Sequence, residues 1–166
     1  MIVAERSIDG GQTRVAAFGA DSVDSLPDNQ IRILVVDDDP LMRALIEDTL
    51  SEEGFSVEQA SSGEVALFTF AGKPFDLILL DVLMPGLDGF ATCVRLRQLP
   101  AGTHVPIMMI TALDDEASIR HAYGAGATDF ITKPINAFML VHRIRYILRA
   151  SAAMRELTWR LDFQRV

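Results

Sequence analysis

Five short apolar runs along the chain have the length of β-strands. The runs at residues 77–80 and 105–110 are unbroken, and the run at residues 31–36 is rich in β-branched residues. The run at residues 55–59 is partly alternating, and the run at residues 128–131 is short. An unbroken apolar run of this length is typical of a strand that is covered on both faces. Helical spacing of apolar residues follows each run, so the pattern predicts five strand–helix repeats.

These repeats predict an α/β fold. Right-handed crossovers between successive strands produce a doubly wound parallel sheet, and five repeats are too few for a closed eight-stranded barrel. The expected architecture is a flavodoxin-like, five-stranded parallel sheet in the strand order 2-1-3-4-5. Helices on both faces would make it an α/β/α sandwich, with an extended C-terminal helix.

Apolar residues at helical spacing predict the buried helix faces. In the helix that Pro40 opens, the expected apolar face consists of Leu41, Leu45 and Leu50, with Met42, Ile46 and Thr49 beside them. In the helix at residues 89–98, the side chains expected to face inward are those of Phe90, Cys93, Val94 and Leu96.

The C-terminal segment predicts one long helix. No Gly or Pro occurs from residue 137 to about residue 163. A helix of that length would extend about 39 Å and project beyond the sheet. Apolar residues form a weak heptad, which predicts a parallel dimer; alternatively, only the part up to Leu148 packs and the rest frays. The seam holds Leu140, Ile147, Met154 and Leu161, with Ala137, Ile144, Ser151 and Thr158 beside them.

The pattern suggests one domain with two tails. Residues 1–30 lack sustained periodicity and are interpreted as a mobile leader without an evident role. Residues 31–150 form the expected domain. Residues 151–166 are interpreted as a helical extension or as a linker to an output domain further along a longer protein.

Composition narrows the classes of function. The formal net charge is −8, and no dense Lys/Arg cluster offsets it, which argues against direct nucleic-acid binding. One cysteine forms no internal disulfide, and the three histidines lie at no zinc-ligand spacing. The sequence shows no membrane span and no export signal, so we expect a cytoplasmic protein.

Polar residues follow four of the five expected strands. Asp37 and Asp38 follow the first strand, Asp81 the third, Thr111 the fourth and Lys133 the fifth. Each has an ordinary interpretation on its own, as a helix cap or a solvated side chain. In a 2-1-3-4-5 sheet, however, these strand ends are neighbours at the edge where ligands bind. We therefore expect the five side chains to converge in one cleft.

This group of side chains suits phosphoryl chemistry. Three carboxylates about 4 Å apart repel one another by roughly 1–4 kcal/mol per pair, so the cluster needs protonation or a hard divalent cation. Mg²⁺ takes oxygen ligands and bridges carboxylates to phosphate oxygens. A hydroxyl and an ammonium beside a nucleophilic carboxylate are the groups that stabilise a transferring phosphoryl group.

Four segments together resemble the receiver domain of two-component response regulators, over roughly residues 31–150. They are Val35-Val36-Asp37-Asp38-Asp39-Pro40, Asp81-Val82-Leu83-Met84-Pro85-Gly86-Leu87-Asp88-Gly89, Thr111-Ala112 and Lys133-Pro134. The resemblance implies a domain that accepts a phosphoryl group in the presence of Mg²⁺ and is not itself an enzyme. It also implies a histidine kinase or a phosphotransfer protein as partner, and for many such domains a small phosphodonor.

The resemblance also implies a role for each site residue. Asp81 would be the phosphoacceptor, with Asp38 and the Leu83 main-chain carbonyl as metal ligands. Asp37 would orient metal-bound water. Lys133 would pair with the phosphoryl group and Thr111 would hydrogen-bond it. Phe130 matches the family's switch aromatic, and its alternative interpretation is a core residue.

Four points about the function stay open from the sequence. Leu83 and Leu113 are apolar where many relatives carry polar residues, which leaves the phosphoryl lifetime undetermined. The segment at residues 37–41 also resembles the nucleophile motif of haloacid-dehalogenase-type phosphatases, in which Asp37 would be the nucleophile. A receiver fold used only as a binding module is the third interpretation. The segment at residues 145–151 resembles regulators joined to domains that make or hydrolyse cyclic dinucleotides.

Overall fold

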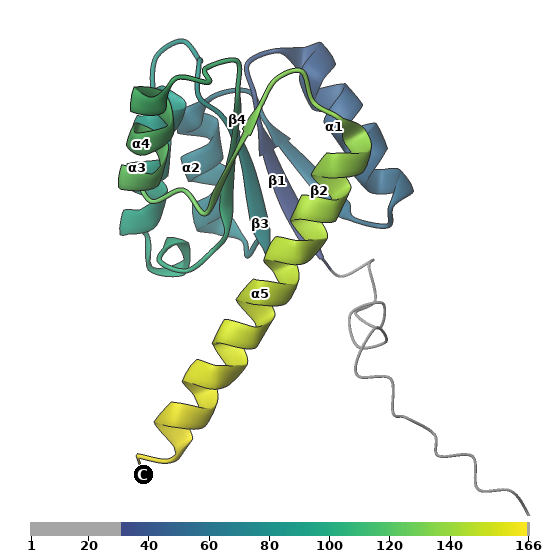
Figure 1. Ribbon diagram of the computed structural model, residues 1–166. Coiled ribbons are helices and arrows are strands. Elements are labelled where there is room, and N and C mark those ends of the chain that lie inside the picture. Colours follow the sequence, from purple (N-terminus) through teal and green to yellow (C-terminus); the bar gives the residue numbers. More distant parts are fainter. Residues whose placement is uncertain (1–30, 166) are drawn as a thin grey trace, which may run out of the picture.

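The computed structural model describes residues 31–165 and contains a parallel sheet in the order β2-β1-β3-β4-β5 (Figure 1). This order confirms the predicted fold class. The expected leader at residues 1–30 lies outside the described residues. In chain order the elements are β1 (Arg32–Val36), α1 (Pro40–Glu52), β2 (Ser56–Ala60), α2 (Gly63–Gly72), β3 (Leu77–Asp81), α3 (Gly89–Gln98), the 3-10 helix η2 (Pro100–Gly102), β4 (Ile107–Thr111), α4 (Glu116–Gly124), β5 (Asp129–Thr132) and α5 (Ala137–Phe163).

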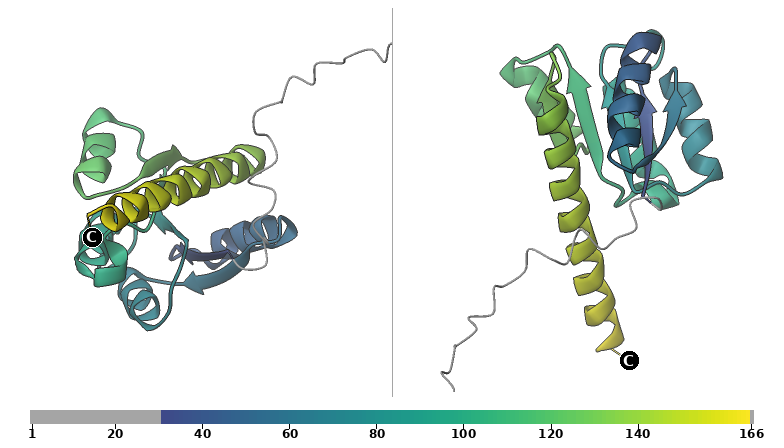
Figure 2. Two further views of the ribbon diagram at one scale, coloured as in Figure 1. Left: turned by 90° about the horizontal axis from the view of Figure 1, so that it is seen from below. Right: turned by 90° about the vertical axis from the view of Figure 1, so that its right-hand side faces the viewer.

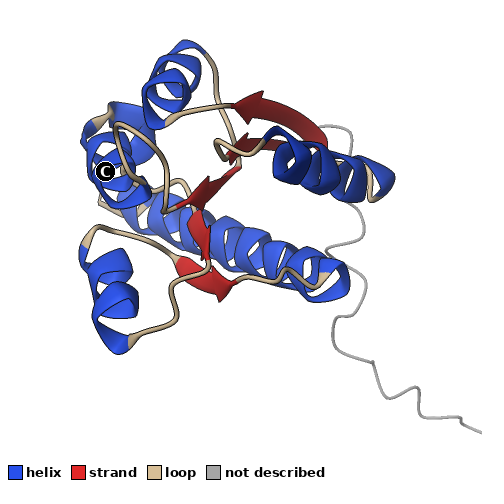
Figure 3. Cartoon of the chain, turned by 90° about the horizontal axis from the view of Figure 1, so that it is seen from above, coloured by secondary structure: helices blue, strands red, loops and turns tan. Residues whose placement is uncertain are grey.

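Helices cover both faces of the sheet, as Figure 3 shows from above. Successive side chains of a strand point to opposite faces, so each central strand contributes to two cores. Leu77 and Leu79 of β3 pack in a cluster with buried side chains of α1 and α5. Ile78 and Leu80 pack in a second cluster with buried side chains of α2, α3 and α4. The central strands are therefore buried on both faces, which explains their unbroken apolar runs.

Two elements begin two residues later than the pattern predicts. β4 begins at Ile107 rather than at residue 105, because Pro106 has no N–H to donate to a strand ladder. The sequence also predicts a helix from residue 114 to about residue 123. α4 begins at Glu116 instead, because the Asp115 carboxylate caps it by accepting a hydrogen bond from the Ser118 N–H at 2.8 Å.

The predicted buried faces of α1 and α3 were partly wrong. In α1, Leu41 is 80% exposed and Leu45 is 59% exposed, whereas Ile46 and Leu50 are buried. Ile46 and Leu50 are four residues apart and share the face that packs on the sheet, while Leu45 lies about 100° around the helix from Ile46. In α3, Val94 is 43% exposed for the same reason.

Helix α5 is continuous from Ala137 to Phe163, as the absence of Gly and Pro predicts. Its first part buries Leu140, Ile144 and Ile147 in the core, and the remainder projects past the sheet (Figure 2). The predicted seam was therefore wrong in its first half, since these side chains already pack within their own chain. Among residues 31–165, no helix is both long and apolar enough to cross a membrane.

The corrected face of α1 gives a testable contrast. Leu50→Ala is expected to lower the free energy of unfolding by about 2–5 kcal/mol, because it leaves a cavity in the core. Leu45→Ala removes the same atoms from an exposed position and is expected to cost less than about 0.5 kcal/mol. Urea unfolding of both variants measures the two values. Equal losses would show that both leucines are packed.

Candidate functional site

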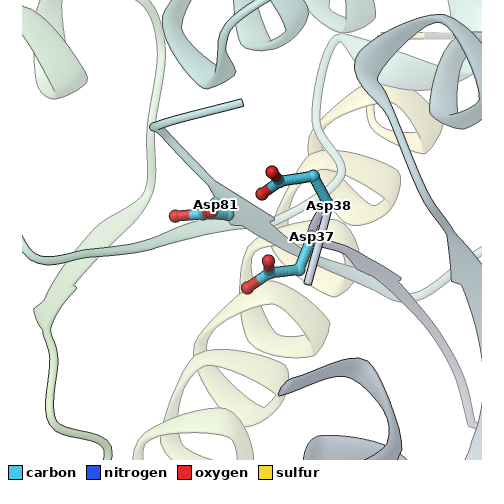
Figure 4. A group of neighbouring side chains, drawn as sticks. All are labelled: Asp37, Asp38 and Asp81. Carbon is cyan, nitrogen blue, oxygen red and sulfur yellow. The ribbon is translucent and has the colours of Figure 1, made fainter. Parts of the chain in front are cut away.

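Three carboxylates meet at the carboxyl edge of the sheet. Strands β1 and β3 are parallel neighbours with Val36 opposite Leu80, so the aspartates that follow lie side by side. One carboxylate oxygen from each of Asp37, Asp38 and Asp81 lies within 4.8 Å of the others. Figure 4 shows the three side chains pointing to the same side of the sheet edge. Asp37 and Asp81 are buried, while Asp38 is exposed.

Hydrogen bonds fix the loop between β1 and α1. The Asp37 N–H donates to the Ala60 carbonyl of β2 at 3.2 Å, which extends the strand pairing by one residue. The Asp39 N–H donates to Asp37 Oδ1 at 2.9 Å. Asp39 in turn caps α1 by accepting a hydrogen bond from the Leu41 N–H at 2.9 Å. The Asp37 carboxylate is thereby oriented by its own loop.

Two hydrogen bonds and the backbone conformation of one glycine fix the loop after Asp81. Gly86 has a φ of +73°, a backbone conformation that favours glycine. Asp88 caps α3 by accepting a hydrogen bond from the Ala91 N–H at 2.8 Å, as the sequence predicts. Glu64 of α2 accepts a hydrogen bond from the Leu87 N–H at 3.2 Å. The loop is thus tied to α2 as well as to α3.

Lys133, which directly follows the edge strand β5, brings a positive charge to the cluster. Its main-chain N–H donates to the Thr111 carbonyl at 2.8 Å, which fixes the residue at the end of β5. Its Nζ lies 3.3 Å from Asp37 Oδ2 and 3.5 Å from Asp81 Oδ1. The structure therefore brings together four of the predicted residues: Asp37, Asp38, Asp81 and Lys133.

Burial and charge shift the acidity of the pocket. Burial and the neighbouring Asp37 charge raise the pKa of Asp81 to about 6, and Lys133 opposes this shift. Burial alone lowers the pKa of Lys133, but Asp81 and Asp37 outweigh it and hold that pKa above its ordinary value. The ionised form of Asp81 is therefore destabilised, while the protonated, positively charged form of Lys133 is stabilised.

One carboxylate oxygen of Asp81 is available to bind a further ligand. Oδ1 is buried and accepts no hydrogen bond within residues 31–165, and its 3.5 Å separation from Lys133 Nζ is too long for a good one. A buried carboxylate oxygen in this state gains from a cation. The three carboxylates are the hard oxygen donors that Mg²⁺ prefers, so the residues present fit that ion.

The remaining predicted residues surround the cluster. Thr111 ends β4, next to β3, and its buried hydroxyl accepts a hydrogen bond from the Leu113 N–H at 3.3 Å. Phe130 lies on β5 and is buried in the core on the α2–α4 side. Leu83 lies two residues past Asp81 with an exposed side chain. Each position is compatible with the role that the resemblance implies, and none demonstrates it.

Two polar residues at the site were missed from the sequence. Arg43 Nη1 donates to the Asp37 main-chain carbonyl at 2.7 Å. Glu64, in the first turn of α2, holds the loop after Asp81. Both contacts join separate elements. The one available signal was a charged residue in the first or second turn of a helix that begins at the ligand-binding edge.

The pKa of Asp81 predicts a pH-dependent stability difference in metal-free protein. The folded pKa of about 6 lies above the ordinary value of 3.8, so the folded state binds more protons between these values, and this group lowers stability as the pH rises through them. Asp81→Asn does not ionise. It is expected to be more stable than wild type above pH about 6, with the difference shrinking towards pH about 4. Urea unfolding in EDTA measures it, and a pH-independent difference would contradict the prediction.

Comparison with known proteins identifies the family. Residues 33–145 match the model of the response regulator receiver domain. Response regulator PleD of Caulobacter vibrioides is 43% identical over 129 residues, which are 78% of this chain and 28% of PleD. Transcriptional regulatory protein TcrA of Mycobacterium tuberculosis is 40% identical over 119 residues, which are 72% of this chain and 46% of TcrA. The chain thus spans less than half the length of these two curated relatives.

A solved structure agrees with these matches. A CheY-like response regulator receiver domain protein from Methanospirillum hungatei superposes with a TM-score of 0.71 at 27% identity, covering 75% of this chain and 98% of that one. The strand order β2-β1-β3-β4-β5 agrees with these matches. The chain belongs to the family of response regulator receiver domains.

Proposed function

We propose that Asp81 is the residue of this receiver domain that accepts the phosphoryl group. The observation that carries the proposal is Asp81 Oδ1, which is buried at the acidic cluster without a hydrogen-bond partner among the described residues. Asp37 Oδ1 and Oδ2 already face the Asp39 N–H and Lys133 Nζ. Asp81 therefore combines a central strand end with an oxygen that remains available.

The proposed transfer is a displacement at phosphorus. An Asp81 oxygen forms the new P–O bond, and the bond from phosphorus to the donor breaks with its electron pair leaving on the donor. The donor is a phosphohistidine of a histidine kinase or phosphotransfer protein, or a small acyl phosphate. Lys133 Nζ lies 3.5 Å from Asp81 Oδ1, so it is placed to neutralise charge on the transferred group. Thr111 is proposed to donate its hydroxyl hydrogen to the same group.

Mg²⁺ is the proposed cofactor. Asp38, Asp81 and the Leu83 main-chain carbonyl would hold it directly, and Asp37 would hold it through water. When bound, the ion supplies positive charge to phosphate oxygens and reduces the repulsion among the carboxylates. Asp37 stays oriented by the Asp39 N–H at 2.9 Å, so the chain itself maintains the geometry of this ligand set.

The proposed output is a change of surface near α4, β5 and α5. A phosphoryl group adds a charge of about −1.5 to −2 beside Thr111 and Lys133. Helix α4 buries only Ala122 among its own residues, so it is the least firmly packed helix on its face. Drawing Thr111 towards the phosphoryl group would shift this helix together with Phe130. A full reversal of the population takes roughly 5.5 kcal/mol, so we expect a partial shift.

The proposed assembly is a homodimer formed by the projecting part of α5. Met154 is 67% exposed and Leu161 is 62% exposed, seven residues apart on one face of the helix. Leu157 lies exposed between them. A stripe of large exposed apolar side chains favours pairing with a second helix.

We also propose a cytoplasmic protein whose residues 31–150 form the receiver domain and whose residues 151–166 extend this domain or link it to an output domain.

Phosphorylation of Asp81 is directly testable by protein mass. Incubation of the full chain with acetyl phosphate and Mg²⁺ is expected to add about 80 Da, labile to hydroxylamine, as for an acyl phosphate. Asp81→Asn removes the nucleophile and is expected to reduce the modified fraction by at least about 100-fold. Asp48→Asn, an exposed aspartate on α1, is the matched control and is expected to behave as wild type.

The same experiment separates the alternatives. Modification that persists in Asp81→Asn and disappears in Asp37→Asn would favour the phosphatase-type nucleophile. A wild-type chain that binds Mg²⁺ but gains no mass from any donor would favour a receiver fold used only for binding.

The dimer proposal predicts an effect confined to the end of α5. Light scattering with a beryllofluoride phosphoryl mimic is expected to detect dimer in the full chain and monomer after truncation at Ala150. Met154→Ser with Leu161→Ser is expected to weaken association by about tenfold or more per residue, since each lost side chain is worth roughly 1.5 kcal/mol or more. The control, Leu41→Ser with Phe68→Ser, removes apolar side chains that are even more exposed, on other helices. Monomeric mass in every sample would rule out the dimer.

A further inference from the structure

We propose that Arg43 is a positioning residue of the acidic pocket, which fixes the Asp37–Asp38 peptide and so aims the Asp38 carboxylate at the cation. The inference rests on the proposed function, because it assigns a role within the same metal site. The Arg43 side chain donates to a main-chain carbonyl and to Gln59. It acts through the backbone of the two residues that precede α1.

The first step of the argument is the hydrogen bond to the peptide. Arg43 Nη1 donates to the Asp37 carbonyl oxygen at 2.7 Å, a length typical of a charge-assisted hydrogen bond. The peptide group is planar, so the Asp37 carbonyl and the Asp38 nitrogen lie in one plane. A bond that holds the oxygen therefore also limits the rotation of the Asp38 backbone.

The second step is that Arg43 is itself held. Its Nε donates to Gln59 Oε1 at 3.0 Å, and Gln59 Nε2 donates to Glu47 Oε2 one turn further along α1. Gln59 lies on β2 opposite Val35 of β1, so the strand pairing fixes its place. The half-buried guanidinium is therefore anchored between α1 and the sheet, and it acts as a rigid support.

The third step is that the Asp38 carboxylate is not held by any contact of its own within residues 31–165. The Asp37 carboxylate is oriented by the Asp39 N–H and by Lys133 Nζ. The exposed Asp38 carboxylate makes no hydrogen bond and no ion pair within residues 31–165. Its direction depends on its own backbone, which Arg43 restrains at the Asp37–Asp38 peptide and the Asp37 carboxylate restrains at the Asp39 N–H.

Positioning and simple electrostatics predict opposite signs for the same substitution. Arg43 carries a positive charge near a cation site, so an electrostatic effect alone would let Arg43→Met bind Mg²⁺ more tightly than wild type. Loss of positioning lets Asp38 rotate away and weakens binding. A purely structural role would lower the melting temperature and leave the Mg²⁺ affinity of the folded protein unchanged.

Isothermal titration of Mg²⁺ into the full chain, below the melting temperature of every variant, tests the proposal. Arg43→Met is expected to weaken Mg²⁺ binding about tenfold, the usual scale for residues that orient metal ligands. Arg43→Lys keeps the charge with a single donor group and is expected to fall between wild type and Arg43→Met. Gln59→Leu removes the anchor and is expected to give a smaller loss in the same direction.

Arg97 supplies a matched control. It also donates to main-chain carbonyls, to Gly102 at 2.8 Å and to Gly126 at 2.7 Å, but these join α3 to loops outside the pocket. Arg97→Met is expected to lower the melting temperature measured in EDTA without changing Mg²⁺ affinity. Asp38→Ala is the positive control, because it removes a proposed ligand outright.

Each outcome has a distinct meaning. Mg²⁺ binding by Arg43→Met that equals or exceeds wild type overturns the inference and leaves the proposed function standing. Wild-type protein that binds no Mg²⁺ overturns the proposed cofactor and the inference with it. If Arg43→Met does not fold, unchanged affinity in both Arg43→Lys and Gln59→Leu overturns the inference in the same way.

Discussion

The burial of the Asp81 carboxylate is the constraint on which the site depends. The strand register places this carboxylate beside Asp37, and both are buried. Lys133 Nζ lies 3.3 Å from Asp37 Oδ2 and 3.5 Å from Asp81 Oδ1 and reduces the repulsion between the two carboxylates. The pKa of Asp81 nevertheless rises to about 6. The folded chain therefore carries an unfavourable charge interaction, which a proton or a cation relieves. The surrounding hydrogen bonds keep these groups in place despite the repulsion.

The fold supplies this support unevenly. The loop after β1 and the loop after β3 are each tied to a neighbouring element, by Arg43 and by Glu64 respectively. Helix α4 lacks comparable burial, since Ala122 is its one buried residue. Its exposed His121 stacks on Phe90 of α3, which is half-buried against the core. An acidic pocket held by hydrogen bonds thus lies next to a less firmly packed helix. This arrangement suits a site at which a change of charge alters the position of a nearby helix and so the surface that it forms.

The sequence predicted most of the fold and the core of the site because both depend on regular patterns. Parallel strands that are buried on both faces give continuous apolar runs, and their ends must share one edge of the sheet, which located Asp37, Asp81 and Lys133. Helix faces were less certain, since a shift of one residue from Ile46 to Leu45 turns a side chain about 100° towards solvent. Arg43 was missed because its partner is a main-chain carbonyl, which the side-chain pattern does not identify; its place in the first turn of α1 was the one signal.

The heptad of α5 illustrates a different limit. Residues seven apart lie on one helix face whether that face packs on a partner helix or on the protein's own sheet, so spacing alone did not reveal that Leu140 and Ile147 are internal. The structure also joins this helix to the strand that carries Phe130. Arg143 Nη1 donates to the Phe130 carbonyl at 3.3 Å and lies 3.7 Å from Asp129 Oδ2. A displacement of Phe130 on phosphorylation would therefore act on the first turns of α5, and a continuous helix transmits a change of tilt to its projecting end. The proposed coupling between the pocket and the proposed dimer surface would then run through Phe130, Arg143 and α5.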